Sequence, residues 1–86
     1  MNINKLISIV KNKLENHILY EDINIEDKTF LHKKHKGHEE NKFHIKITIK
    51  SSELKKMNKV QSTKKIYTIL NEELKIYIHS IQILIN

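Results

Sequence analysis

Apolar residues near the start of the chain fall three or four positions apart, which is the spacing of one face of an α-helix. This run extends from Ile3 to Leu14, and Asn2 or Asn4 precedes it as a candidate N-cap. Most of the intervening lysines fall on the opposite face of such a helix. The pattern predicts a first amphipathic helix from Ile3 to about Asn16.

Three segments have the patterns of β-strands. Tyr20–Asp27 and Phe43–Lys50 alternate apolar and polar residues, as half-buried strands do. In the second of these segments the isoleucines share one face. His44 belongs to the polar face, where we interpret it as a structural or interfacial residue. The segment Tyr77–Ile85 is apolar at most positions, which is typical of a strand covered by helices.

Two helices are predicted between the second and third strands. Ser51–Glu53 is a helix-start signal for a short turn around Leu54, and a longer helix is predicted from about Asn58 to Lys75. The expected buried stripe of the longer helix consists of Val60, Thr63, Ile66, Tyr67, Leu70 and Leu74. The order is α-β-β-α-α-β, without repeats or linkers. It predicts a single α+β domain over residues 1–86, with one three-stranded sheet covered by helices.

The composition limits the chemistry that the chain can perform by itself. It has 86 residues and no cysteine, which excludes disulfides and any zinc or iron–sulfur site built from its own thiolates. A metal site would therefore need histidines, carboxylates or sulfur donated by a partner. The sequence contains no recognisable nucleophile motif and no phosphate-binding loop, so we expect no enzymatic activity.

The net charge of +6 comes entirely from lysine, since the chain contains no arginine. Arginine is preferred for bidentate contacts to bases and phosphates, so this composition disfavours sequence-specific reading of nucleic acid and leaves backbone contacts open. No apolar run approaches the ~18 residues of a membrane span, and the N-terminus has neither a secretory nor a transit pattern. We expect a cytoplasmic protein without membrane contact, with the mitochondrion as the alternative in a eukaryote.

The histidines are the main candidates for metal chemistry. His32, His35 and His38 lie in one polar segment, and His79 opens the last apolar run. Imidazole is the commonest metal ligand among side chains, so these residues are candidates to meet over one metal or cluster. The alternative is a solvated segment and a packed strand residue, because His79 shares its strand parity with Ile81.

Five segments, in order along the chain, resemble signatures of the BolA-like family. Ile23–Thr29 is similar to an apolar-acidic-apolar-x-Asp-x-Ser run, His32–Gly37 to His-Ala-Gly-His-x-Gly, His44–Ser51 to His-Phe-x-Val-x-Ile-x-Ser, Leu70–Leu74 to Leu-x-x-Glu-Leu, and His79–Ile83 to His-Ala-Leu-x-Ile. The resemblance extends over nearly the whole chain. Two segments depart from the family pattern. The family's Phe-x-Gly is Leu54–Lys56 here, without the glycine, and the family's Arg-His-Arg is Ser62–Lys64, with a single positive charge.

The resemblance implies an α-β-β-α-α-β fold related to the type II KH domain, with a three-stranded mixed sheet covered by helices. It also implies a heterodimer with a monothiol glutaredoxin, in iron–sulfur cluster trafficking or iron regulation. A [2Fe-2S] cluster is then shared with the glutaredoxin and glutathione. The isolated chain is expected to be a monomer that binds no cofactor tightly.

The ligands that the resemblance assigns to this chain are His79 and one histidine of the segment between the first two strands. Counting forward from Asp27 selects His32 as that second ligand, whereas counting back from His44 selects His35. We take His32 first and His35 second, with His38 as a bystander.

The competing hypothesis is a KH-like transcriptional regulator that binds nucleic acid, with weak DNA binding through Lys59, Lys64 and Lys65. An RNA-binding KH domain clamps the backbone with a Gly-x-x-Gly loop. The corresponding junction here, Lys55–Lys59, contains no glycine. We therefore expect these lysines to form a solvated face or to contact acidic parts of a protein partner.

Overall fold

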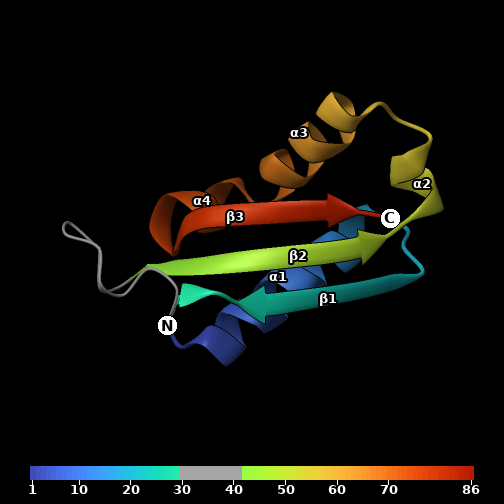
Figure 1. Ribbon diagram of the computed structural model, residues 1–86. Helices are drawn as coiled ribbons and strands as arrows, with labels where there is room; N and C mark the ends of the chain where they lie inside the picture. Colours follow the sequence, from blue (N-terminus) through green and yellow to red (C-terminus); the bar gives the residue numbers. More distant parts are fainter. Residues whose placement is uncertain (30–41) are drawn as a thin grey trace.

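The computed structural model describes residues 1–29 and 42–86. The elements in chain order are α1 (Ile3–His17), β1 (Asp22–Asp27), β2 (Phe43–Lys50), α2 (Ser52–Lys55), α3 (Lys59–Ile69), α4 (Asn71–Ile76) and β3 (Ile78–Ile85) (Figure 1). Strand β2 is central, antiparallel to β1 and parallel to β3. The α+β fold with a three-stranded mixed sheet is therefore confirmed. Among the described helices, none has the length and apolarity to cross a membrane.

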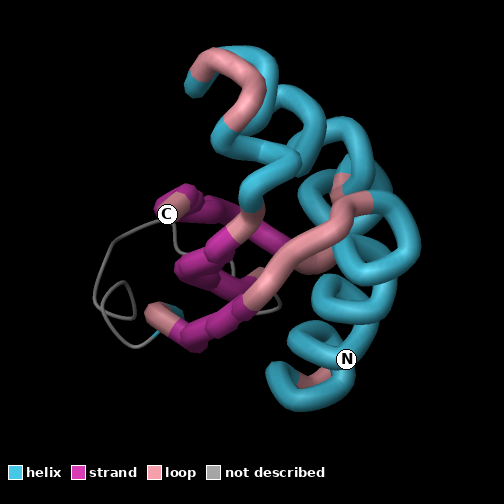
Figure 2. Tube along the Cα trace, turned by 90° about the vertical axis from the view of Figure 1, so that its right-hand side faces the viewer, coloured by secondary structure: helices cyan, strands magenta, loops and turns pink. Residues whose placement is uncertain are grey.

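The core lies between the sheet and the helices. Figure 2 shows α1 along one side of the sheet, and the opposite side carries no described helix. The buried apolar residues are Leu6, Val10, Leu14, Ile18, Ile45, Ile47, Ile49, Leu54, Ile66, Leu70 and Ile78. Three of them come from the stripe predicted for the first helix, and three are the alternate isoleucines of β2. The amphipathic patterns of these two segments are confirmed.

The prediction of one helix from Asn58 to Lys75 is wrong. Helix α3 ends at Ile69, and α4 begins at Asn71, because Leu70 has φ −96° and ψ 17°, which is not helical. The break loses few hydrogen bonds, since the Leu70 N–H still donates to the Ile66 carbonyl at 3.0 Å. Leu70 itself is fully buried. The sequence around Leu70 contains no local helix breaker, so we attribute the break to the packing of Leu70 in the core and not to local helix propensity.

The buried stripe of α3 also differs from the predicted one. Val60 is 76% exposed and Tyr67 is 41% exposed, whereas Ser62 and Ile66 are buried. The true stripe continues from these two residues to Leu70, at helical spacing. Serine is tolerated there because the Ser62 hydroxyl donates to the Lys59 carbonyl at 3.1 Å. The prediction is therefore confirmed for Ile66 and Leu70, which are buried, and wrong for Val60 and Tyr67.

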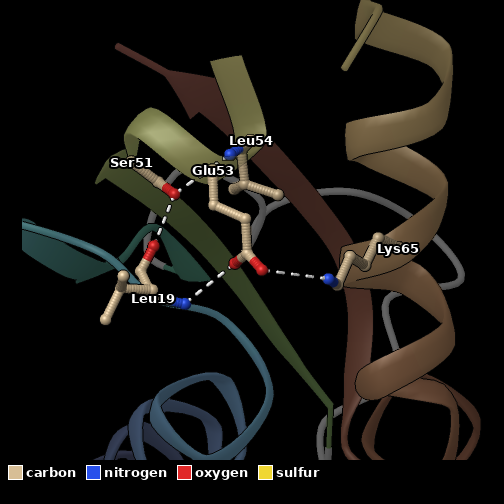
Figure 3. Close-up of polar contacts among 5 residues, drawn as sticks. All are labelled: Leu19, Ser51, Glu53, Leu54 and Lys65. Carbon is tan, nitrogen blue, oxygen red and sulfur yellow. Dashed lines mark hydrogen bonds and ion pairs between the residues drawn. The ribbon is translucent and has the colours of Figure 1, made fainter. Parts of the chain in front are cut away.

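A polar junction joins α2 to the turn after α1 and to α3 (Figure 3). The Ser51 hydroxyl accepts from the Leu54 N–H at 3.1 Å, which confirms the predicted helix start, and donates to the Leu19 carbonyl at 2.7 Å. The Glu53 carboxylate accepts from the Leu19 N–H at 2.8 Å and lies 3.6 Å from the Lys65 ammonium. Both backbone polar groups of Leu19 are therefore satisfied by side chains of the β2–α2 corner.

Candidate functional site

The candidate site lies at the end of the sheet where β2 and β3 begin. These two strands are parallel, so Phe43 lies opposite Ile78, and β1 ends beside them because it runs antiparallel to β2. His79 therefore lies at the same end of the sheet as the last residues of β1. This is also the end where Thr29 and Lys42 border the segment that is not described.

His79 occupies an irregular position in β3. Phe43 pairs with Ile78, but the next residue, His44, pairs with Ser80. His79 is thus an extra residue between two paired positions, as in a β-bulge, and both His79 and Ser80 are exposed. The alternative of a packed core histidine, which followed from strict alternation with Ile81, is wrong.

The His44 side chain lies beside His79 on the face of the sheet away from the helices. His44 is 5% exposed, although it follows the polar parity of β2. Its Nδ1 lies 2.6 Å from the Ser80 Oγ, and its ring centroid lies 5.0 Å from that of His79, with the rings tilted by 42°. The sequence placed His44 on the correct face but gave no sign of its burial or of these two contacts.

The end of β1 fixes the backbone of His44. The His44 N–H donates to the Thr29 hydroxyl at 3.2 Å, and the His44 carbonyl accepts from the Lys28 N–H at 2.7 Å. Thr29 is held in turn by Asp27, whose carboxylate accepts from the Thr29 N–H at 2.9 Å and from its hydroxyl. The Asp-x-Thr segment, which matches the Asp-x-Ser signature, therefore anchors the start of β2 at His44.

The other predicted cluster ligands lie outside the described residues. These are His32 and His35, together with the bystander His38. Within residues 1–29 and 42–86, no three histidine, aspartate or glutamate side chains gather closely enough to hold a metal ion. A metal site at the exposed imidazole of His79 would therefore need ligands from outside the described residues.

The three lysines of the competing hypothesis lie on α3, where Lys59 and Lys64 border one hollow and Lys64 and Lys65 border another. Lys59 also borders a further hollow of about 260 Å³ between the α2–α3 junction and the end of β3, with Leu54, Met57 and Ile85 in its lining. Lys64 does not border this hollow, and Lys65 forms an ion pair with Glu53. Only one of the three predicted lysines therefore faces this further hollow.

The chain is similar to known proteins over most of its length. The profile of the BolA-like protein family matches residues 14–86. The DNA-binding transcriptional regulator BolA of Haemophilus influenzae is 34% identical over 73 residues, which cover 85% of this chain and 68% of that protein. Among solved structures, BolA1 from Arabidopsis thaliana has a TM-score of 0.76 and 27% identity, over 92% of this chain and 87% of that one. The BolA domain of SufE1 from the same plant shares the fold, with a TM-score of 0.78 and 23% identity over 100% and 93% of the two chains.

Proposed function

Because this chain belongs to the BolA-like family, we propose that it is an adaptor that binds a monothiol glutaredoxin and supplies ligands to a [2Fe-2S] cluster. The observation that carries the proposal is the position of His79. This side chain is exposed, lies outside the regular pairing of β3, and matches the histidine that opens the family's last strand. A partner can reach it without any rearrangement of the core.

The donor set of the chain suits a shared cluster better than one of its own. The chain has no cysteine, so any thiolate ligands come from partners, and the family resemblance assigns them to a cysteine of the glutaredoxin and to glutathione. His79 and a second histidine then complete the site. Two imidazoles on one iron and two thiolates on the other give the asymmetry of a Rieske-type centre, which has a higher reduction potential than a centre with four thiolates.

The second ligand is assigned to His32 first and His35 second. His32 follows Thr29 by three residues, a length of chain that spans at most about 11 Å, and His35 follows it by six, or about 22 Å. Thr29 is hydrogen-bonded to His44, whose ring lies 5.0 Å from that of His79. Thr29 follows β1, and β2 lies between β1 and β3, so about two strand spacings, or about 10 Å, separate it from β3. Both lengths of chain can span this distance, and the preference for His32 rests on the count forward from Asp27.

The test is a titration of this protein into a [2Fe-2S]-loaded monothiol glutaredoxin with glutathione, followed by visible absorption and circular dichroism. We expect a saturable spectral change at one-to-one stoichiometry that is lost in His79→Ala. His17→Ala is the matched control, because His17 is an exposed histidine at the end of α1, far along the chain from the site. An unchanged spectrum with the wild-type protein would refute the adaptor function.

The same titration separates the candidates for the second ligand. Single His32→Ala and His35→Ala variants identify the ligand if one of them reproduces the spectrum of His79→Ala. If only the double variant does so, the two histidines replace each other. If the double variant keeps the wild-type spectrum, the assignment of the second ligand to either of these residues is wrong.

The second candidate function is nucleic-acid binding, which two observations favour. The Haemophilus influenzae relative is named a DNA-binding transcriptional regulator. The hollow beside Lys59 has an apolar lining from α2 and β3, and Lys55 also borders it. The lysines beside this hollow can contact the phosphates of a nucleic acid.

This alternative predicts affinity that falls steeply with salt, since each neutralised phosphate releases counterions. Lys59→Ala should weaken binding and reduce the salt dependence, whereas Lys65→Ala should have a smaller effect because Lys65 is paired with Glu53. Lys11→Ala, which removes an exposed lysine of α1, is the control for general charge. Equal losses in all three variants would indicate nonspecific attraction and would argue against a defined nucleic-acid surface.

A further inference from the structure

An exposed imidazole needs an orienting neighbour to be a good metal ligand. A free histidine side chain occupies several staggered rotamers, and each of them aims the ring nitrogens in a different direction. Metal-binding histidines are usually held by surrounding groups, and loss of such a group typically weakens metal binding about 10- to 100-fold. The groups that surround His79 therefore affect how strongly its imidazole can bind a metal.

We propose that His44 is the positioning residue for His79. The proposal rests on the adaptor function argued above. In this arrangement, His44 is a fixed ring on the neighbouring strand, and the His79 ring packs against it in the orientation that binds iron. His44 acts through His79 and is not itself a ligand.

Three hydrogen bonds and burial hold His44 in place. Its backbone N–H and carbonyl are bonded to Thr29 and Lys28, its ring Nδ1 is bonded to the Ser80 hydroxyl at 2.6 Å, and the residue is 5% exposed. A ring with these restraints cannot leave its site without breaking several contacts. It therefore presents an immobile flat surface.

The contact with His79 has the geometry of an aromatic pair. The centroid separation is 5.0 Å and the tilt is 42°, within the range of about 4.5–7 Å at which rings attract each other. His79 is exposed, so the His44 ring restricts one side of it and leaves the remainder open to a partner. Rotamers that turn His79 away from His44 lose this contact.

The first measurement uses the free protein and needs no cluster. Nuclear Overhauser effects between the ring protons of His44 and His79, with three-bond couplings at His79, report the ring contact and the χ1 rotamer. We expect one dominant rotamer in the wild-type protein. His44→Phe should keep this rotamer because it keeps a ring, whereas His44→Ala should average the couplings over several rotamers. Averaged couplings in the wild-type protein would overturn the proposal.

The second measurement uses the complex with a cluster-loaded monothiol glutaredoxin. Cluster lifetime under chelator challenge should be about tenfold shorter for His44→Ala, and His44→Phe should restore it to within about twofold of wild type. Thr48→Ala, on the same face of β2 but farther along the strand, is the control and should behave as wild type. If His44→Phe is as defective as His44→Ala, the ring contact is not what matters and the proposal fails.

A third readout separates positioning from ligation. Pulsed electron paramagnetic resonance of the reduced cluster detects nitrogen coupling from each ligating histidine. His79→Ala should remove one coupling, and His44→Phe should remove none. Loss of a coupling in His44→Phe would make His44 a ligand and refute its positioning role.

Two precautions keep the outcomes distinguishable. Ser80→Ala removes the hydrogen bond to the His44 ring from an exposed position and keeps the ring, as His44→Phe does, so the two variants should behave alike even if His44→Ala folds poorly. A Ser80→Ala defect as large as that of His44→Ala would mean that the hydrogen bond, and not the ring contact, orients His79, and would count against the proposal. If the wild-type protein forms no complex with the glutaredoxin, the adaptor function fails, and the measurements on the free protein still decide whether His44 orients His79.

Discussion

Replacement of Ser51 by alanine tests whether the junction in Figure 3 stabilises the fold. The change removes two hydrogen bonds from a residue that is 0% exposed, so water cannot readily replace the hydroxyl. Loss of the N-cap bond to the Leu54 N–H costs about 1 kcal/mol, and loss of the bond to the Leu19 carbonyl costs about another 1 kcal/mol. We expect the free energy of unfolding to fall by about 2 kcal/mol.

Urea denaturation followed by far-ultraviolet circular dichroism measures this loss. With a slope of about 1–3 kcal/mol/M, Ser51→Ala should lower the urea midpoint by about 1–2 M and leave the slope unchanged. Ser8→Ala is the matched control, because Ser8 is an exposed residue within α1, where alanine is the better helix former. A Ser51→Ala midpoint no lower than that of Ser8→Ala would refute the reasoning and mean that other groups satisfy both partners.

Three further predictions concern stability. Ile47→Ala in the central strand should cost about 2–5 kcal/mol in urea denaturation, while Val60→Ala, at an exposed position, should cost less than about 0.5 kcal/mol; equal losses would contradict the assignment of the core. The Ser52 hydroxyl and N–H lower the pKa of Glu21 below 4.5, so this interaction stabilises the fold above the unfolded pKa and the contribution is lost as pH falls through the folded pKa. Glu21→Gln should therefore flatten the acid limb of the stability profile, and an unchanged limb would count against this assignment. The Glu73 carboxylate, 2.7 Å from the Lys13 ammonium, raises the pKa of Lys13 above 10.5, so their interaction is lost as pH rises through the folded pKa. Glu73→Gln should reduce the alkaline loss of stability, and a loss equal to that of wild type would mean that the pair contributes nothing.

Patterns that depend on one element were predictable from the sequence, because a buried face repeats at the period of its own backbone. The isoleucines of β2 and the apolar stripe of α1 are examples. Helix α3 shows the limit of this reasoning, since the apolar Tyr67 fits the helical period as well as the buried Ile66 does, and the buried Ser62 gives no apolar signal. Only packing against the rest of the core selects between them. The break at Leu70 has the same cause.

The sequence named His79 as a candidate ligand, but it did not predict the geometry around this residue. The family signatures selected His79, and the exposure of this residue follows from a register shift that no local pattern reveals. The burial of His44 depends on contacts with Thr29 and Ser80, which are 15 and 36 positions away along the chain. Which side chains meet across two strands can be predicted only when the pairing register of those strands is known.

The irregularity at the start of β3 explains how two adjacent residues, His79 and Ser80, both contact His44. In a regular strand, successive side chains point to opposite faces, so His79 and Ser80 would lie on different sides of the sheet. The extra residue leaves Ser80 opposite His44 in the pairing, where its hydroxyl fixes the ring, and places the His79 ring 5.0 Å from the same imidazole. Ile81 and Ile83 still pack against the core, so the sheet keeps its buried face. One inserted position therefore brings both the Ser80 hydroxyl and the exposed His79 ring to His44, and neither contact requires a change in the rest of the fold.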